Sequence, residues 1–163
     1  MPPFPSDSPR VHHAAPRTHR HDAPHAGLPR RLAALVYDAL LLFGVLFAAG
    51  APVVALVDAA VLPGGRFHVL YQAYLAAVIY LFFGWFWTHG GQTLGMRAWR
   101  LRVQRPDGTT LGWGRALVRL LAAVLSAGAL GLGYLWILVD REGLAWHDRV
   151  SGSCLVVSPR RRG

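Results

Sequence analysis

The chain has 163 residues, a length typical of one domain. It is 53% hydrophobic, carries a formal net charge of +9, and has arginine at all 17 of its basic positions. The charges flank apolar runs and no groove-reading motif is present, so the composition excludes a nucleic-acid-binding protein and predicts a membrane protein. A single cysteine, Cys154, excludes a disulfide within the chain.

The composition divides the chain into three parts. Residues 1–28 are rich in proline, histidine and arginine and have no apolar periodicity, so we predict a disordered tail. The histidines of this tail fit no defined metal-binding spacing. Residues 29–158 form the predicted transmembrane domain, and residues 159–163 a basic C-terminal tail.

Two apolar runs, residues 32–57 and 69–87, predict transmembrane helices, because each is long enough to cross a hydrocarbon core of about 30 Å. Asp38 is the only formal charge inside the first run, and Pro52 is expected to kink or fray its far end. Aromatic residues near the two ends of the second run resemble interfacial belts: Tyr71, Tyr74, Trp85 and Trp87.

The third apolar run, residues 116–139, contains Ser126, Gly128, Gly131 and Gly133. It either crosses once or folds back as a hairpin or re-entrant pair. We favour the fold-back, because "RLRVQ" (100–104) and "SCLVV" (153–157) then pair as strands in a small cytoplasmic cap. A Pro-Asp-Gly turn after residue 104 also suggests a further strand. The predicted fold class is an all-α membrane protein with two clear transmembrane helices, a third glycine-broken apolar helical segment and a small β cap.

The arginines predict the orientation of the chain. They cluster before the first run and again after the second, whereas the loop at 58–66 holds one arginine and one aspartate. The positive-inside bias therefore places the N-terminus in the cytoplasm.

Asp38 lies seven residues after Arg31, so on a helix the two side chains project from nearly the same face, about 10 Å apart along the axis. An ionised carboxylate facing lipid costs several kcal/mol, so Asp38 is expected to be neutral or to face the bundle interior. Arg119, at the start of the third run, is its expected partner by depth. Two interpretations stay open: a pair that fixes helix packing, or a proton or cation site.

Other polar residues are predicted to support structure. The "GGQTLGMR" segment (90–97) lacks the lysine of a phosphate-binding loop and predicts a tight turn, in which Gln92 and Thr93 cap a helix or hydrogen-bond near Asp38. Asp148 is expected to pair with an arginine of the cap, such as Arg97 or Arg149, with a proton-relay role as the alternative. We predict no catalytic, cofactor-binding or metal-binding residue and no enzymatic activity.

Four segments in order resemble the RDD family of bacterial membrane proteins: "RRLAALVYD", "GGQTLGMRAWRLRVQRPDG", "GRALVR" and "LGLGYLWILVDREGLAWHDRVSGSCLVV". The resemblance covers residues 29–158. It implies that Arg31, Asp38 and a second aspartate are the residues that name the family. We prefer Asp148 as this second aspartate, with Asp140 as the alternative.

The resemblance also implies a multi-pass protein of the bacterial inner membrane with a transport role, either proton or monovalent-cation exchange or transport of a small ligand. The alternative is a non-transporting scaffold or accessory subunit whose charges only lock helix packing. The few predicted helices cannot form a complete transport pathway within one chain. The pathway is therefore expected to lie between the protomers of a homo-oligomer. The lipid bilayer is the expected partner, without nucleic acid or a cofactor, and the sequence leaves the ion or ligand open.

Overall fold

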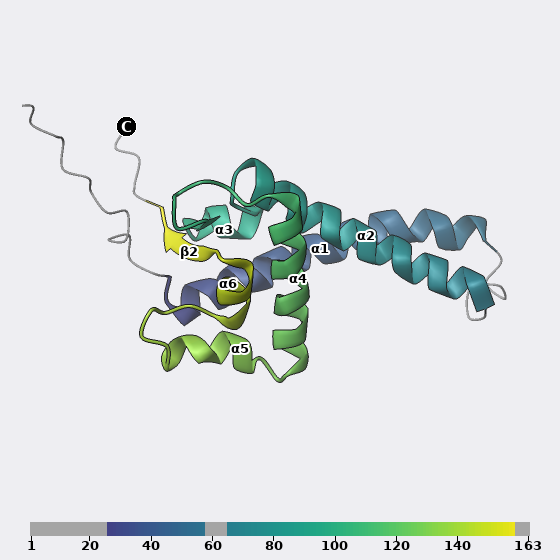
Figure 1. The fold of residues 1–163 in the computed structure, drawn as a ribbon. Coiled ribbons are helices and arrows are strands. Elements are labelled where there is room, and N and C mark those ends of the chain that lie inside the picture. The colour runs from purple at the N-terminus through teal and green to yellow at the C-terminus, as the bar shows by residue number, and fades with distance from the viewer. Residues whose placement is uncertain (1–25, 58–64, 159–163) are drawn as a thin grey trace, which may run out of the picture.

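The computed structural model describes residues 26–57 and 65–158 (Figure 1). The predictions of a disordered N-terminal tail and a basic C-terminal tail concern mainly residues 1–25 and 159–163, which lie outside the described residues. Most of the loop at 58–66 lies outside them too.

Two long helices, α1 (Leu28–Leu56) and α2 (Gly65–His89), form a hairpin that extends away from the rest of the molecule (Figure 1). Both are long and apolar enough to cross a membrane, which confirms the two predicted spans. Pro29 lies in the first turn of α1, where a missing N–H is tolerated. Pro52 lies within α1, which continues for about one more turn. The Tyr74 hydroxyl donates to the Ala49 carbonyl at 3.3 Å and joins the two helices.

The third apolar run is broken and bent. It forms α4 (Trp113–Gly128), then α5 (Leu132–Leu135) and a 3-10 turn η2 (Trp136–Leu138), with a bend of 104° at the break. Leu130 and Gly131 both have positive φ at this bend, +54° and +75°. This confirms the glycine-broken segment. Figure 1 shows α4 running across the long axis of α1 and α2 instead of beside them.

A small cap covers the end of the hairpin where α1 begins. It consists of α3 (Leu94–Ala98), β1 (Leu101–Gln104), α6 (Trp146–Ser151) and β2 (Cys154–Val157). The two strands pair antiparallel, with Val103 opposite Leu155, so the predicted pairing of the two segments is confirmed. The further strand suggested after the Pro-Asp-Gly turn does not form, since residues 109–112 hold no strand. The Arg105 N–H instead donates to the Thr109 carbonyl at 2.9 Å.

The turn from α2 into the cap depends on Gly91. Its φ is +68°, and a Cβ there would lie 2.3 Å from the Val103 carbonyl oxygen. The Gly91 carbonyl accepts a hydrogen bond of 2.7 Å from the Val103 N–H and so covers the free edge of β1. The predicted tight turn is therefore present, and it requires glycine.

The buried core lies in the cap and under the adjoining helix ends, and consists of Ala26, Ala34, Trp87, Leu101, Val103, Leu111, Ala116 and Leu155. The Ala26 N–H donates to the Leu155 carbonyl at 3.3 Å. The start of α1 and the last strand therefore lie at the same end of the hairpin, as the fold-back requires. Trp87 was predicted to lie in an interfacial belt, but it is a core residue because α4 folds over it, whereas Trp85 is exposed.

Arg100 connects α3 to β1 with a φ of +56°, a conformation that residues with a Cβ disfavour. We expect Arg100→Gly to raise the free energy of unfolding by up to about 1 kcal/mol, because glycine adopts this conformation without strain. Thermal unfolding in detergent measures the change. Arg102→Gly, in β1 itself, is the control and should destabilise the protein. A loss of stability in Arg100→Gly would contradict the prediction.

Candidate functional site

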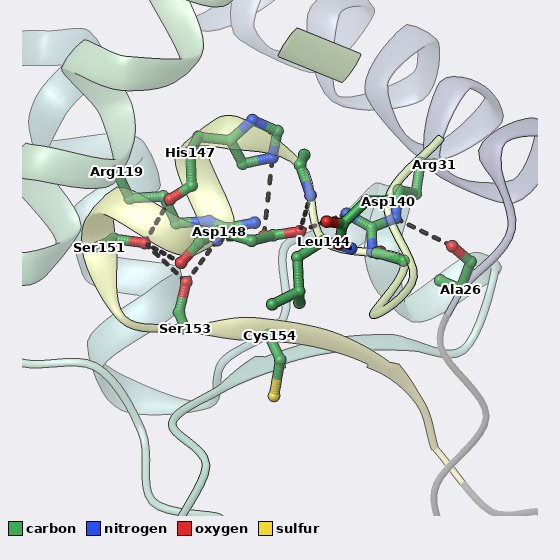
Figure 2. Close-up of polar contacts among 12 residues, drawn as sticks. Ala26, Arg31, Arg119, Asp140, Leu144, His147, Asp148, Ser151, Ser153 and Cys154 are labelled. Atoms are coloured by element: carbon green, nitrogen blue, oxygen red, sulfur yellow. Dashed lines mark hydrogen bonds and ion pairs between the residues drawn. The ribbon is translucent and has the colours of Figure 1, made fainter. Parts of the chain in front are cut away.

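Asp148 is fully buried and binds two arginines that come from distant parts of the chain (Figure 2). The Nη1 atom of Arg31 donates to its Oδ2 at 2.5 Å, and the Nη1 atom of Arg119 donates to its Oδ1 at 2.6 Å. We call Arg31, Asp148 and Arg119 the charge clamp. It joins the first turn of α1, the middle of α4 and the first turn of α6.

The local fold of α6 places the acid between the arginines. Asp148 lies in the first turn, where a carboxylate is favoured, and its Oδ2 also accepts the Ala145 N–H at 3.1 Å. Gly152 ends α6 with a φ of +59°. The resulting turn brings the Ser153 hydroxyl to 2.5 Å from Arg119 Nη1, from which it accepts a second hydrogen bond.

The two arginines use their nitrogens differently. All three side-chain nitrogens of Arg31 are engaged, since Nε donates to the Ala26 carbonyl at 2.9 Å and Nη2 to the Gly143 carbonyl at 3.1 Å. Arg119 makes both of its hydrogen bonds through Nη1. Its guanidinium lies 5.4 Å from the centre of the Trp87 ring, within the range of a cation–π interaction.

Asp38 is buried, with 2% of its surface exposed, and it faces the cap together with Arg31 and Ala34. This confirms that Arg31 and Asp38 share one face of the helix. Asp38 Oδ2 accepts a hydrogen bond from the Thr93 hydroxyl, and Oδ1 accepts one of 2.8 Å from the Gly95 N–H. Thr93 also caps α3 by accepting the Met96 N–H at 3.2 Å.

Two predicted pairings are wrong. Arg119 binds Asp148 and Ser153 rather than Asp38. Asp148 binds Arg31 and Arg119 rather than Arg97 or Arg149. The reason is the path of α4, which crosses the hairpin and packs on α6. The predicted pairings matched residues by their depth in the membrane, and this holds only for helices that run side by side. Gln92 does not reach Asp38 either; its amide donates to the Leu101 carbonyl at 2.7 Å.

Asp140 belongs to a separate ion pair. Its Oδ1 accepts from Arg149 Nη2 at 2.6 Å, and its Oδ2 accepts the Leu144 N–H at 2.8 Å. The Leu144 N–H, helped by the Arg149 guanidinium, lowers the pKa of Asp140. The Arg149 side chain is half exposed, whereas the Asp140 side chain is only 6% exposed, so this pair lies at the edge of the cap, outside the clamp.

Electrostatics keep Asp148 ionised and His147 neutral. Burial alone would raise the pKa of Asp148, but Arg119 and Arg31 outweigh it and hold this pKa well below the usual range. Burial, together with the Arg119 charge, lowers the pKa of His147 from 6.5 to about 3. His147 Nε2 lies 3.7 Å from Asp148 Oδ1, and at neutral pH this contact is not an ion pair.

His147 makes the stability of the cap depend on pH. Because its pKa is about 3 in the folded protein and 6.5 unperturbed, the stability it contributes is complete above pH 6.5. That stability is lost as pH falls, by up to about 1.4 kcal/mol per pH unit. The contribution of Asp148 is lost only at lower pH, since its pKa is also lowered. Unfolding between pH 7 and 4.5 tests this: His147→Phe should flatten the slope and the exposed control His68→Phe should leave it unchanged. An unchanged slope in His147→Phe would contradict the assignment.

A cavity of about 330 Å³ lies between α1, α2 and α4 beside the clamp. Its polar wall residues are Arg31, Asp38, Arg119, Tyr134 and His147. The remaining wall is apolar and includes Leu35, Leu42, Ile79, Phe83, Leu120 and Val124. We call this space the helix cavity. Its rim is open, since Ala39 and Val124 belong to the wall and are exposed.

Four residues of the site were not predicted from the sequence: Trp87, Tyr134, His147 and Ser153. Trp87 reads as a membrane-interface residue, and nothing in the order of the chain places it under Arg119. His147 precedes Asp148 in the chain, but adjacent residues give no signal of the arginines that approach from α1 and α4. Within residues 26–57 and 65–158, no group of three or more His, Cys, Asp or Glu side chains is placed to hold a metal ion.

Comparison with known proteins identifies the family of the chain. A search of curated proteins and a search of solved structures each found no match. The model of the RDD family matches residues 25–152, most of the chain, and this range contains Arg31, Asp38, Asp140 and Asp148. The match agrees with the two membrane-spanning helices and with the segments that resemble the family. The chain therefore belongs to the RDD family.

Proposed function

We propose that this membrane protein binds a small ligand in the helix cavity as part of a transport role, and that it is not an enzyme. The observation that carries the proposal is the cavity itself, an open, largely apolar space with guanidinium groups in its wall. Binding sites for small molecules are typically apolar cavities with a few placed polar groups. In this proposal the charge clamp fixes the cap on α1 and keeps the polar end of the cavity in place.

The contacts of Asp38 favour a structural role over a cation site. Both of its oxygens accept hydrogen bonds, one from the Thr93 hydroxyl and one from the Gly95 N–H. A cation at Asp38 would compete with these donors, whose hydrogens carry partial positive charge. The second candidate, a scaffold whose charges only lock the helices, is supported by the same contacts. Asp38→Asn in proteoliposomes separates cation exchange from the ligand-binding and scaffold proposals. If the variant assembles normally but loses pH-dependent ion flux, cation exchange is favoured.

The experiment that tests ligand binding fills the cavity. Ala39→Phe places a ring in the cavity wall, and the control Ala48→Phe places one on the same helix at an exposed position away from the cavity. We expect purified protein to bind single-chain probes, dodecanoate and dodecanol among them. Ala39→Phe should weaken this binding at least about tenfold, whereas Ala48→Phe should leave it unchanged. Equal binding by both variants would contradict a ligand site in the cavity and favour the scaffold.

We also propose that the protein lies in the bacterial inner membrane with the start of α1 in the cytoplasm, supported by the arginines around the cap. The hydrogen bond between Ala26 and Leu155 places β2 at that same end. In a Cys154→Ser background, Ser158→Cys should react with an impermeant maleimide only from the cytoplasmic side. Leu56→Cys, at the far end of α1, should react from the opposite side. Labelling of Ser158→Cys from the periplasm would overturn this orientation.

A further inference from the structure

The polar end of the helix cavity contains an arginine with unused donors. Arg31 and Arg119 both belong to the cavity wall and are both buried. Each of the three side-chain nitrogens of Arg31 already donates to a protein oxygen. Arg119 donates only through Nη1, so its Nε and Nη2 form no hydrogen bond with any described residue. Arg119 is therefore the guanidinium in which two nitrogens have no protein partner in the described ranges and can donate to a ligand.

Two further groups beside Arg119 lack partners. Trp87 Nε1 and His147 Nδ1 are buried and form no hydrogen bond within the described part of the chain. Each residue is 5% exposed, and each is part of the cavity wall. Figure 2 shows one nitrogen of the His147 ring facing Asp148 and the other turned away from it. Buried polar groups are normally hydrogen-bonded, so unpartnered ones along a cavity indicate a site for a polar ligand group.

From these groups we infer that the ligand is a single-chain amphiphile with an anionic, acceptor-rich head, either a carboxylate or a phosphate. The inference rests on the proposed function and names its substrate class. The guanidinium of Arg119 and the indole N–H of Trp87 are donors only, so they require acceptor atoms on the ligand. Hydrogen bonds from a guanidinium to a carboxylate or phosphate are among the strongest in proteins.

The charges in the wall permit an anion. The wall contains two guanidinium groups and one acid, Asp38, whose oxygens are already bonded to Thr93 and Gly95. Asp148 lies behind the two arginines and is not part of the wall. When Asp38 and Asp148 are both ionised, their negative charges equal the positive charges of the two arginines. The head group therefore gains from local donors in a buried setting, rather than from a large excess of positive charge.

The rest of the wall matches a single alkyl chain. Leu35, Leu42, Ile79, Phe83, Leu120 and Val124 give an apolar lining. The volume of about 330 Å³ lies at the lower end of the range of about 300–1,000 Å³ for small-molecule sites. A small, apolar and open cavity suits one chain, which enters from the rim at Ala39 and Val124 while its head lies at Arg119.

Four dodecyl probes that differ only in their head groups test the inference: dodecanoate, dodecyl phosphate, dodecanol and dodecylammonium. The full chain in an uncharged maltoside detergent is titrated with each probe, with thermal unfolding as the readout and native mass spectrometry for stoichiometry. We expect at least one of the two anionic probes to bind about tenfold more tightly than dodecanol, and dodecylammonium to bind most weakly. A tighter carboxylate indicates a fatty-acid type of ligand, and a tighter phosphate indicates a lipid phosphate.

Trp87→Phe removes the indole donor and keeps a ring beneath Arg119. It should lower the preference for the anionic probe over dodecanol several-fold, whereas Trp85→Phe, on the exposed face of the same helix, should not change it. Equal affinity for dodecanol and both anions would overturn the inference and leave the proposed function standing. Absence of binding by all four probes would overturn both the inference and the proposed function. A change in the oligomeric mass of Ala39→Phe without a change in probe binding would also overturn both, because the cavity would then be an interface between protein chains.

Discussion

Asp148→Asn is expected to lower the free energy of unfolding of the cap by about 3–5 kcal/mol. The carboxylate is the shared acceptor of Arg31 and Arg119, at 2.5 Å and 2.6 Å. Asparagine has nearly the same shape but no charge, so two guanidinium groups stay buried without a counter-ion. Chemical unfolding followed by tryptophan fluorescence measures the loss, because Trp146 lies in the same helix as Asp148.

The control for this substitution is Asp140→Asn, which removes an ion pair in which the cation, Arg149, is half exposed. Because solvent screens the half-exposed Arg149, the effect of Asp140→Asn should be clearly smaller than that of Asp148→Asn. A second variant, Arg119→Gln in the Asp148→Asn background, should recover part of the lost stability, since it removes one of the uncompensated cations. Equal effects of Asp148→Asn and Asp140→Asn would show that the charge clamp does not stabilise the cap.

Gly95→Ala is expected to destabilise the protein by about 2–3 kcal/mol, although replacing glycine by alanine within a helix normally stabilises it by about 1 kcal/mol. A Cβ at position 95 would lie 2.5 Å from the Ala34 carbonyl oxygen and 2.8 Å from the Asp38 carboxyl group. The backbone carbonyl of α1 cannot move aside as a flexible side chain would. The substitution would therefore separate α3 from α1 and break the hydrogen bond of 2.8 Å between Gly95 and Asp38.

Gly114→Ala is the matched control, because Gly114 is also helical and a Cβ there meets no atom within 4 Å. It should be neutral or slightly stabilising in the same thermal unfolding measurement. Both variants gain the helix propensity of alanine. The difference between their changes in stability therefore measures the effect of the close approach of α3 to α1. A Gly95→Ala protein as stable as Gly114→Ala would contradict the proposed role of Asp38 in holding α3 on α1.

The sequence by itself determined the two spans, the broken third run and the pair of strands in this protein. The two spans follow from the length of the apolar runs, and the break in the third run follows from its glycines, since both are local properties of the chain. The pairing of β1 with β2 followed from two strand-like segments and the need to place both at one end of the membrane. The shared face of Arg31 and Asp38 followed from helix geometry alone.

The tertiary structure alone decided the partners of the charges. α4 crosses the hairpin instead of running along it, and this path moves Arg119 away from Asp38 and onto Asp148. The same path covers Trp87 and encloses the helix cavity. Helix periodicity fixes which face of a helix a side chain occupies, but the crossing of two helices depends on packing between residues far apart in the chain. For this reason the charged residues could be selected from the sequence, whereas the clamp they form could not.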